Sequence, residues 1–152
     1  MWIALAVLLV LVTLWLALIL PARSRKEQRA PFSGRTFAHR GLFSKDQIVP
    51  ENSLPAFRAA VEADYGVELD VQLTRDKQVV VFHDDDLTRA CGVNARVDAY
   101  SFEELQTLSL FGTSEKIPLF TDVLATIHGK IPMIVELKSG GILPCKIGRA
   151  HV

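Results

Sequence analysis

The stretch Gly66–Leu73, GVELDVQL, decides the fold of this chain. Successive side chains of an extended strand point to opposite faces, so this alternation predicts a strand with one apolar and one polar face. The two faces are Val67, Leu69, Val71 and Leu73 on one side and Glu68, Asp70 and Gln72 on the other. A strand with one polar face packs its apolar face against helices or another sheet.

Glu68 and Asp70 are neighbours on the polar face, about 6.6 Å apart along the strand. Two neighbouring carboxylates repel each other unless a positive charge lies between them. Ca²⁺ and Mg²⁺ prefer oxygen ligands, so a hard divalent cation is one explanation of the pair. An exposed strand with a polar outer face is the other explanation, and this strand alone does not decide between them.

The remaining pattern alternates strands with helices. Asn52 or Ser53 can cap a helix over Leu54–Asp64, and Ser101 with Glu104 forms a capping box. The other expected elements are strands at Arg35–Gly41, Gln78–His83 and Lys130–Lys138 and a helix carrying Phe120, Val123, Leu124 and Ile127 that Gly129 closes. This order favours a parallel sheet with helical crossovers, as an open doubly wound sheet or as a barrel. No glycine-rich dinucleotide fingerprint follows the first strand.

Titratable side chains gather at the ends of the four expected strands. They are His39, Arg40, Glu68, Asp70, His83, Glu136 and Lys138. A single histidine at a strand end is commonly structural, but strands of a parallel sheet are normally apolar on both faces. Four polar strand ends therefore indicate an active site.

The residue types at these ends suit cleavage of a phosphate ester. Glu68, Asp70 and Glu136 are three acidic ligands for one hard cation. The two imidazoles can move protons near neutral pH, and the two basic side chains can hold an anionic substrate. The chain has no Gly-x-Ser-x-Gly elbow, which argues against a serine acyl enzyme.

The N-terminal segment predicts a membrane anchor. Residues Trp2–Leu20 are apolar except for Thr13, and their length matches the hydrocarbon thickness of a bilayer. A cleaved signal peptide is the alternative, but no Lys or Arg precedes the run and the residues before Pro21 are a poor cleavage site. The basic residues after the span favour a cytoplasmic domain by the positive-inside rule, and they are Arg23, Arg25, Lys26 and Arg29.

Composition excludes some partners. The chain has 17 basic residues (Lys and Arg) and 17 acidic residues (Asp and Glu), so its formal net charge is zero. No nucleic-acid partner is therefore expected. The two cysteines, Cys91 and Cys145, do not define a disulfide framework, which agrees with a reducing compartment. Nothing in the sequence predicts the oligomeric state.

As a set, the strand-end residues closely resemble the glycerophosphodiester phosphodiesterase family. The matching pieces are His39-Arg40-Gly41, Pro50-Glu51-Asn52-Ser53, Glu68-Leu69-Asp70, His83-Asp84 with Leu87 and Arg89, and Glu136-Leu137-Lys138. The resemblance runs from about Arg35 to Ser139. It implies a TIM-type (β/α)8 barrel that hydrolyses glycerophosphodiesters to an alcohol and glycerol 3-phosphate.

The resemblance also implies roles for single residues. Glu68, Asp70 and Glu136 would hold one Ca²⁺ or Mg²⁺ ion. His39 and His83 would be the acid/base pair, with the order of their action left open. The two basic side chains, Arg40 and Lys138, would stabilise the phosphate.

The chain is expected to contain only the N-terminal half of such a barrel, because a whole one has eight strands and about 250 residues. The expected divisions are an anchor at 1–21, a linker at 22–34, a partial barrel at 35–139 and an atypical tail at 140–152. The tail ends in KIGRAHV, which resembles sequencing-adapter read-through, so a truncated chain with little or no activity is expected. The alternatives are a phosphodiesterase acting on lysolipid or phosphoinositide head groups and a membrane-tethered binding protein without activity.

Overall fold

The computed structural model describes residues 2–19, 27 and 30–138 of the chain. These residues belong to two units, Met1–Ser33 and Gly34–Val152. The predicted tail at 140–152 lies outside the described residues, as do Cys145 and the basic residues Arg23, Arg25, Lys26 and Arg29.

The first unit contains the helix α1 (Trp2–Ile19) and the short 3-10 helix η2 (Ala30–Phe32). No residue of α1 is buried, and the hydroxyl of its polar residue Thr13 donates to the carbonyls of Leu9 and Val10. Helix α1 is long and apolar enough to cross a bilayer, and a signal sequence at this position would satisfy the same criteria. The predicted helix is thus present, and its insertion in a membrane stays a prediction.

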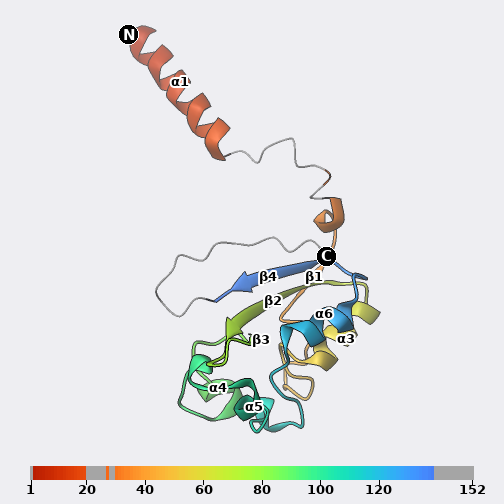
Figure 1. Ribbon diagram of the computed structural model, residues 1–152. Helices are drawn as coiled ribbons and strands as arrows, with labels where there is room; N and C mark the ends of the chain where they lie inside the picture. The colour runs from red at the N-terminus through yellow and green to blue at the C-terminus, as the bar shows by residue number, and fades with distance from the viewer. Residues whose placement is uncertain (1, 20–26, 28–29, 139–152) are drawn as a thin grey trace. The chain divides into compact units, whose positions relative to one another are not determined.

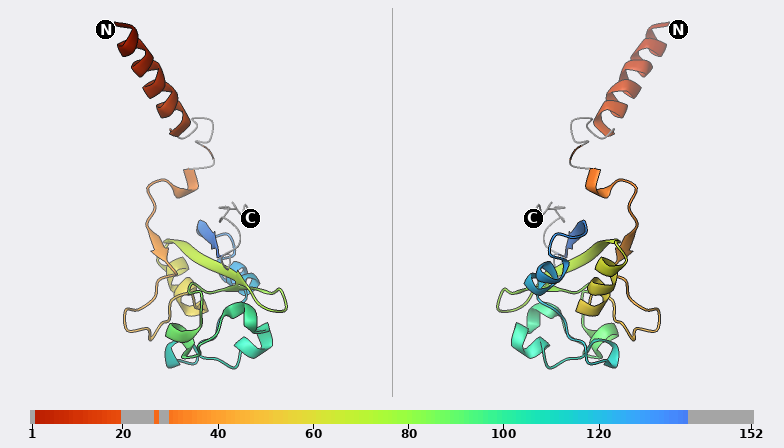
Figure 2. Two further views of the ribbon diagram at one scale, coloured as in Figure 1. Left: turned by 90° about the vertical axis from the view of Figure 1, so that its left-hand side faces the viewer. Right: turned by 90° about the vertical axis from the view of Figure 1, so that its right-hand side faces the viewer.

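The second unit is an α/β domain (Figures 1 and 2). Its elements are β1 (Phe37–His39), α3 (Leu54–Glu62), β2 (Gly66–Leu73), β3 (Val79–Val81), α4 (Thr88–Cys91), η3 (Val97–Ala99), α5 (Phe102–Leu105), η4 (Leu110–Gly112), α6 (Phe120–Ile127) and β4 (Met133–Leu137). The two longer helices, α3 and α6, pack against each other and against the sheet. This arrangement confirms the predicted class and every predicted strand, although three of the four strands are shorter than expected.

Strand β2 is the centre of the sheet. Strand β1 pairs with it in parallel over Gly66–Glu68, and β4 pairs in parallel over Val67–Val71. Because Val67 has a partner in each of these strands, β1 and β4 lie on opposite edges of β2. The same reasoning at Val71, which faces both β3 and β4, places β3 on the edge that β1 occupies.

Strand β3 corrects the expectation of a parallel sheet, since it runs antiparallel to β2. The connection between them is a tight turn in which the amide of Thr74 donates to the carbonyl of Gln78 at 3.0 Å. A parallel pair needs a crossover of a dozen or more residues, and this turn is far too short for one. Lys77 takes a left-handed conformation, with φ of 63°, to close the turn.

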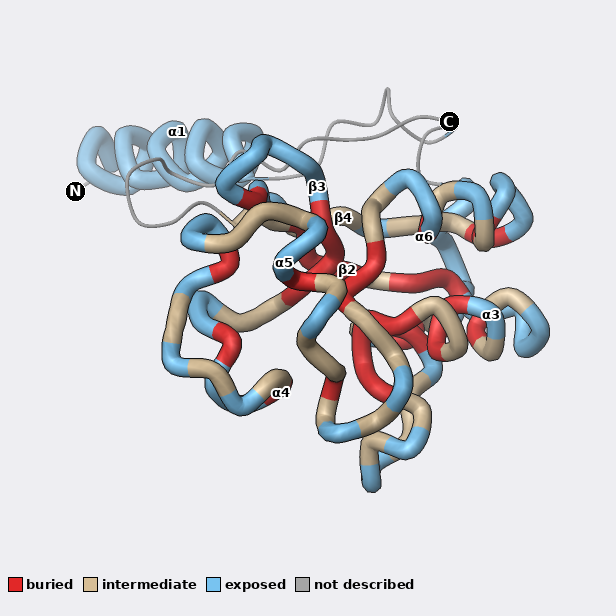
Figure 3. Tube along the Cα trace, turned by 60° about the horizontal axis from the view of Figure 1, so that its bottom comes forward, coloured by how far each residue is buried: buried red, intermediate tan, exposed pale blue. Residues whose placement is uncertain are grey.

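The main core lies between the sheet and the helices α3 and α6. The apolar face of β2 supplies Val67, Leu69 and Val71, and the helices supply Phe57, Ala60, Val123 and Ile127. Figure 3 shows the buried trace along β2 and the inner side of α3. Leu73 was expected to share this face but is 50% exposed, because it lies at the end of β2 where the chain turns into β3.

A second core, which the sequence did not predict, forms beneath the excursion between β3 and α6. Its buried residues are Val80, Phe82, Leu87, Ala90, Val97, Leu105, Leu110 and Ile117. The short helices α4 and α5 contribute to it, and the capping box predicted at Ser101 and Glu104 begins α5. Helix α5 ends at Leu105, because the next residues form turns.

Candidate active site

Strands β1 and β3 reach the middle of β2 from opposite directions along one edge. The amide of Arg40, just after β1, donates to the carbonyl of Glu68 at 2.7 Å. The amide of Phe82, just after β3, donates to the carbonyl of Asp70 at 2.9 Å. The predicted histidines at the ends of these two strands therefore arrive at neighbouring positions of β2.

Strand β4 brings its polar residues to the same part of β2 from the other edge. Asp70 and Glu136 are opposite each other in the register, and the amide of Lys138 donates to the carbonyl of Val71 at 3.0 Å. The backbone positions of polar residues from four strands thus come together. They lie around the middle of β2 because β3 runs antiparallel.

The turn after β1 fixes the backbone of Arg40. Arg40 and Gly41 both have positive φ angles, 61° and 81°. A Cβ atom at Gly41 would lie 2.9 Å from the Cβ of Ala56 in α3, so this position requires glycine. The carbonyl of Arg40 accepts a hydrogen bond from the amide of Asn52 at 2.8 Å, which ties the turn to the segment before α3.

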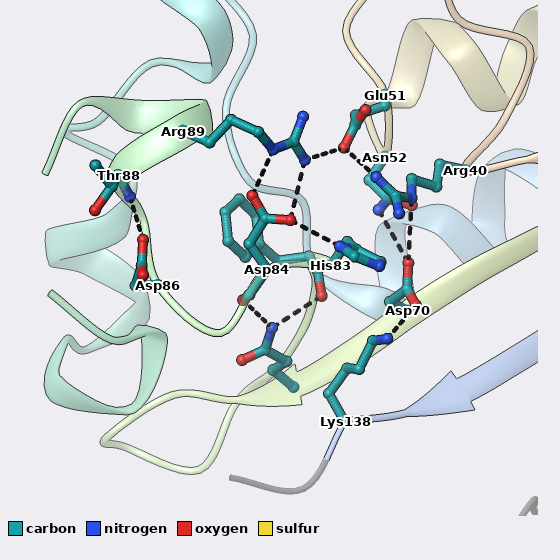
Figure 4. A network of polar contacts seen from close by, with 12 residues as sticks. Arg40, Glu51, Asn52, Asp70, His83, Asp84, Asp86, Thr88, Arg89 and Lys138 are labelled. Atoms are coloured by element: carbon teal, nitrogen blue, oxygen red, sulfur yellow. Dashed lines mark hydrogen bonds and ion pairs between the residues drawn. The ribbon is translucent and has the colours of Figure 1, made fainter. Parts of the chain in front are cut away.

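Asp70 is the buried centre of the site, with 3% of its surface exposed (Figure 4). Its Oδ1 lies 3.3 Å from Nζ of Lys138, and its Oδ2 lies 4.0 Å from Nε of Arg40. The side-chain amide of Asn52 donates to Oδ2 at 3.4 Å. Two cations from different strands thus compensate the charge of one buried carboxylate, as burial of a charge requires.

Lys138 also pairs with Glu136, whose Oε1 accepts a hydrogen bond from Nζ at 2.7 Å. This hydrogen bond is the main reason that the pKa of Glu136 is below its ordinary value. Burial lowers the pKa of Lys138, but its hydrogen bond to Glu136 and the charge of Asp70 outweigh burial and raise it. The ammonium of Lys138 is therefore held in its charged form between the two carboxylates.

Glu68 and His39 differ from the other predicted residues in their side-chain contacts. Within residues 30–138, neither side chain has a hydrogen bond or ion pair, and His39 is exposed. In the same part of the chain, no three His, Cys, Asp or Glu side chains are arranged to hold a metal ion. By donor type, Glu68, Asp70 and Glu136 still fit a hard divalent cation, because all three offer carboxylate oxygens, and Asp70 and Glu136 lie opposite each other on β2 and β4.

His83 is held by an acidic neighbour. Its Nδ1 lies 2.7 Å from Oδ1 of Asp84, and Asp84 is in turn bound by both ends of the Arg89 guanidinium (Figure 4). The two Arg89 distances are 2.7 Å from Nε to Oδ2 and 3.1 Å from Nη2 to Oδ1. Burial raises the pKa of Asp84, but hydrogen bonds from Arg89 and His83 outweigh it and lower the pKa.

Glu51 connects this group with Arg40. Its Oε1 accepts from Nη1 of Arg40 at 2.9 Å and also from Nη2 of Arg89. The Glu51 side chain is 8% exposed, and burial raises its pKa. The hydrogen bonds from Arg89 and Arg40 outweigh burial, so the pKa of Glu51 is lowered and its carboxylate stays charged.

Sequence reasoning assigned four of these polar residues no role in the site, although Asn52 was a candidate helix cap. They are Glu51, Asn52, Asp84 and Arg89. All four belong to the short motifs that carry the family resemblance, and this was the only feature of the sequence that pointed to them. Their contacts were hidden because they join loops far apart in the chain, as with Arg89 and Glu51, which are 38 residues apart.

The chain matches the model of the glycerophosphoryl diester phosphodiesterase family over residues 39–141. It is 39% identical over 115 residues to a glycerophosphodiester phosphodiesterase of Caldanaerobacter subterraneus, covering 70% of this chain and 46% of that protein. It is 32% identical over 141 residues to lysophospholipase D GDPD1 of Rattus norvegicus, covering 84% of this chain and 44% of that protein. The chain thus spans less than half the length of the curated relatives it matches.

A solved structure also resembles the chain. An Oleispira antarctica phosphodiesterase in complex with the product sn-glycerol-3-phosphate aligns with a TM-score of 0.62 and 30% identity. The alignment covers 70% of this chain and 45% of that protein. Sequence and backbone comparisons therefore agree on one family.

Proposed function

Because this chain belongs to the glycerophosphoryl diester phosphodiesterase family, we propose that it acts in the hydrolysis of glycerophosphodiesters to an alcohol and glycerol 3-phosphate. One observation carries the proposal for this site. Within the described residues, Nε of Arg40 is buried and makes no hydrogen bond. A buried donor without an acceptor costs free energy, and a phosphate oxygen of the substrate would supply that acceptor.

Arg40 and Lys138 are the proposed phosphate-binding residues. They contact Asp70 from the ends of β1 and β4, and both basic side chains lie beside the imidazole of His83 (Figure 4). Fixed cations at such a position stabilise the negative charge on the equatorial oxygens of a phosphoryl group in the transition state.

His39 and His83 are the proposed proton carriers. One imidazole accepts the proton of the attacking oxygen, from a glycerol hydroxyl or water, as that oxygen forms its bond to phosphorus. The bond between phosphorus and the leaving alcohol oxygen breaks, and the other imidazole gives that oxygen a proton. If the attacking oxygen is a glycerol hydroxyl, this step gives a cyclic phosphate, which water then opens to glycerol 3-phosphate in a second step.

Glu68, Asp70 and Glu136 are the proposed ligands of one divalent cation, Ca²⁺ or Mg²⁺. The support is the oxygen donor set and the pairing of Asp70 with Glu136 across β2 and β4, with Glu68 two residues before Asp70 on β2. When bound, such an ion supplies positive charge that stabilises the phosphate oxygens.

Residues 35–139 are proposed to be the first half of a TIM-type barrel. The support is the length of the match, which is under half of each relative, and the parallel pairing of β1, β2 and β4. Residues 1–21 are proposed to anchor this domain to a membrane, with the domain on the cytoplasmic side. Alkaline carbonate extraction and a reporter fused after residue 34 test the anchor and its orientation.

A lysolipid is the second candidate substrate. The match to the rat lysophospholipase D covers 84% of this chain, which is more than residues 35–152 contain. It therefore extends into the segment before residue 35, which follows the apolar helix α1. A substrate with an acyl chain agrees with an enzyme held at a membrane.

The test uses a chimera in which residues 35–138 are followed by the C-terminal half of the Caldanaerobacter enzyme. We expect it to release glycerol 3-phosphate from glycerophosphocholine in the presence of Mg²⁺ or Ca²⁺, as a coupled dehydrogenase assay detects. His39→Ala and His83→Ala should each abolish release while leaving cation binding intact. A folded chimera that binds the cation and releases no product from glycerophosphocholine or lysophosphatidylcholine would contradict the proposal. The 152-residue chain, assayed beside it, is expected to show little or no release.

A further inference from the structure

His83 has an ionised partner on one ring nitrogen. Its Nδ1 lies 2.7 Å from Oδ1 of Asp84. An ionised carboxylate can only accept hydrogen bonds, so Nδ1 carries the proton in this contact. In the neutral ring, Nε2 is then left with its lone pair and is the nitrogen that can accept a proton.

Arg89 holds the carboxylate of Asp84, which in turn holds the ring of His83. Its guanidinium binds both oxygens of Asp84, and a two-point contact of this kind sets the direction of the carboxylate as well as its position. The guanidinium carbon also lies 5.3 Å from the centre of the Phe111 ring, which limits its movement from the other side. Asp84 is thus held by more than its contact with His83.

Glu51 connects Arg89 to Arg40, one of the two proposed phosphate-binding residues. One carboxylate oxygen of Glu51 accepts hydrogen bonds from both Arg89 and Arg40. The resulting series of contacts runs from His83 through Asp84, Arg89 and Glu51 to Arg40, with the charges of its last four members alternating in sign (Figure 4). A displacement of Arg89 would therefore disturb both a proton carrier and a phosphate ligand.

The backbone around His83 is held independently. The side-chain amide of Gln72 in β2 donates to the carbonyls of Phe82 and Asp84, at 3.1 Å and 2.7 Å. These two residues flank His83 in sequence. Because the backbone has its own support, loss of the Asp84 carboxylate should free the ring without releasing the segment.

We propose that Asp84 and Arg89 are positioning residues that hold the proton on Nδ1 of His83, present Nε2 to the substrate and, through Glu51, couple His83 to Arg40. The catalytic part of this statement rests on the proposed function, but the proton position of His83 does not. The neutral form of a histidine without such a partner favours the proton on Nε2. The proposal therefore predicts a measurable difference in the resting protein.

The test is ¹⁵N NMR of the 152-residue chain in lipid nanodiscs, with labelled histidine. The chain has four histidines, and the signals lost in His83→Gln identify His83. At a pH where the ring is neutral, we expect the Nδ1–H form in the unaltered chain and a shift toward Nε2–H in Asp84→Ala and in Arg89→Met. Arg96→Met is the matched control, because Arg96 makes the same two-point contact with Asp98 and is similarly exposed.

Two results would overturn the proposal: an Nε2–H form in the unaltered chain, or an Nδ1–H form that persists in both variants. If Asp84→Ala does not fold, Arg89→Met decides the question, since its side chain is 47% exposed and tolerates replacement better.

A kinetic measurement on the chimera separates positioning from folding. Asp84→Ala should lower kcat by about tenfold or more with little change in KM, since general acid–base catalysis depends on ring placement. Arg89→Lys should recover part of the kcat lost in Arg89→Met. A rise in KM at unchanged kcat would contradict the role. If the chimera has no activity at all, the proposed function fails while the NMR result still decides the proton position of His83.

Discussion

Asp70 and Glu136 lie opposite each other on paired parallel strands, and one ammonium group contacts both carboxylates. That group is Nζ of Lys138, which comes from the end of the same strand as Glu136. Without a cation between them, two carboxylates so close together repel each other. Lys138 and a divalent ion are thus two ways of compensating the same pair of charges.

Replacing Lys138 by Met should destabilise the domain by about 2 kcal/mol when EDTA is present, less than the cost of breaking a fully buried pair because this side chain is partly exposed. Ca²⁺ or Mg²⁺ should recover part of the loss. Thermal unfolding with EDTA and with each ion measures both effects. Lys116→Met is the control, because Lys116 donates to the Ser109 hydroxyl and contacts no carboxylate within residues 30–138. An equal loss in the two variants would argue against charge compensation by Lys138.

Glu68→Gln should weaken binding of Ca²⁺ or Mg²⁺ by about tenfold or more, as loss of a charged oxygen ligand does. The free energy of unfolding without metal should change by less than about 0.5 kcal/mol, since Glu68 has no side-chain partner in the described part of the chain. Calorimetric titration and urea unfolding measure the two quantities. The control is Glu103→Gln, an exposed glutamate of α5. Unchanged cation affinity in Glu68→Gln would remove this residue from the proposed ligand set.

Glu51→Gln should lower the free energy of unfolding at neutral pH. The loss, measured against the unaltered chain, should be smaller in acid. The pKa of Glu51 in the folded protein is below its ordinary value of 4.5, so the ionised carboxylate favours folding above that pH. This contribution is lost as the pH falls through the lowered pKa. The stability difference between the two proteins should therefore be largest near pH 7 and shrink below about pH 4, as urea unfolding at a series of pH values would show. A difference that does not depend on pH would contradict the charged state assigned to Glu51.

Gly41→Ala should destabilise the domain more than Gly92→Ala does. Both glycines have positive φ angles, 81° and 72°, so both substitutions carry a backbone cost of about 1 kcal/mol. A Cβ at Gly41 would also meet Ala56, whereas nothing lies within 4 Å of one at Gly92. The extra loss at Gly41 should be about 1–3 kcal/mol by thermal unfolding. Equal losses would show that the contact with Ala56 relaxes at little cost.

The parts of the fold that the sequence predicted are those with local signals. The alternation of β2, the Ser53 cap of α3 and the capping box that begins α5 each depend on a few neighbouring residues, and each is present. The direction of β3 was predicted wrongly because strand patterns have no direction. Only the length of the connecting turn carries that information.

The sequence identified which residues belong to the candidate site better than it identified their contacts. The polar face of β2 identified Glu68 and Asp70, but the position of Lys138 between Asp70 and Glu136 depends on pairing across β2 and β4. The contact of Arg89 with Glu51 depends on the second core, which places α4 near the segment before α3. Contacts of this kind follow from tertiary packing, which no local pattern encodes.

An inserted residue should be tolerated in some parts of the chain and not in β2, because of the polar face of this strand. The three side chains of that face, Glu68, Asp70 and Gln72, follow one another at every second residue, and Asp70 and Gln72 hold groups from other strands. A single residue inserted in β2 would turn part of this face toward the helices. Asp70 and Gln72 could then no longer both contact the groups that they bind now. The excursion over residues 87–117 has its own core and can change in length with less effect on the sheet. Among relatives of this protein, differences in length should therefore collect in that excursion and leave β2 unchanged.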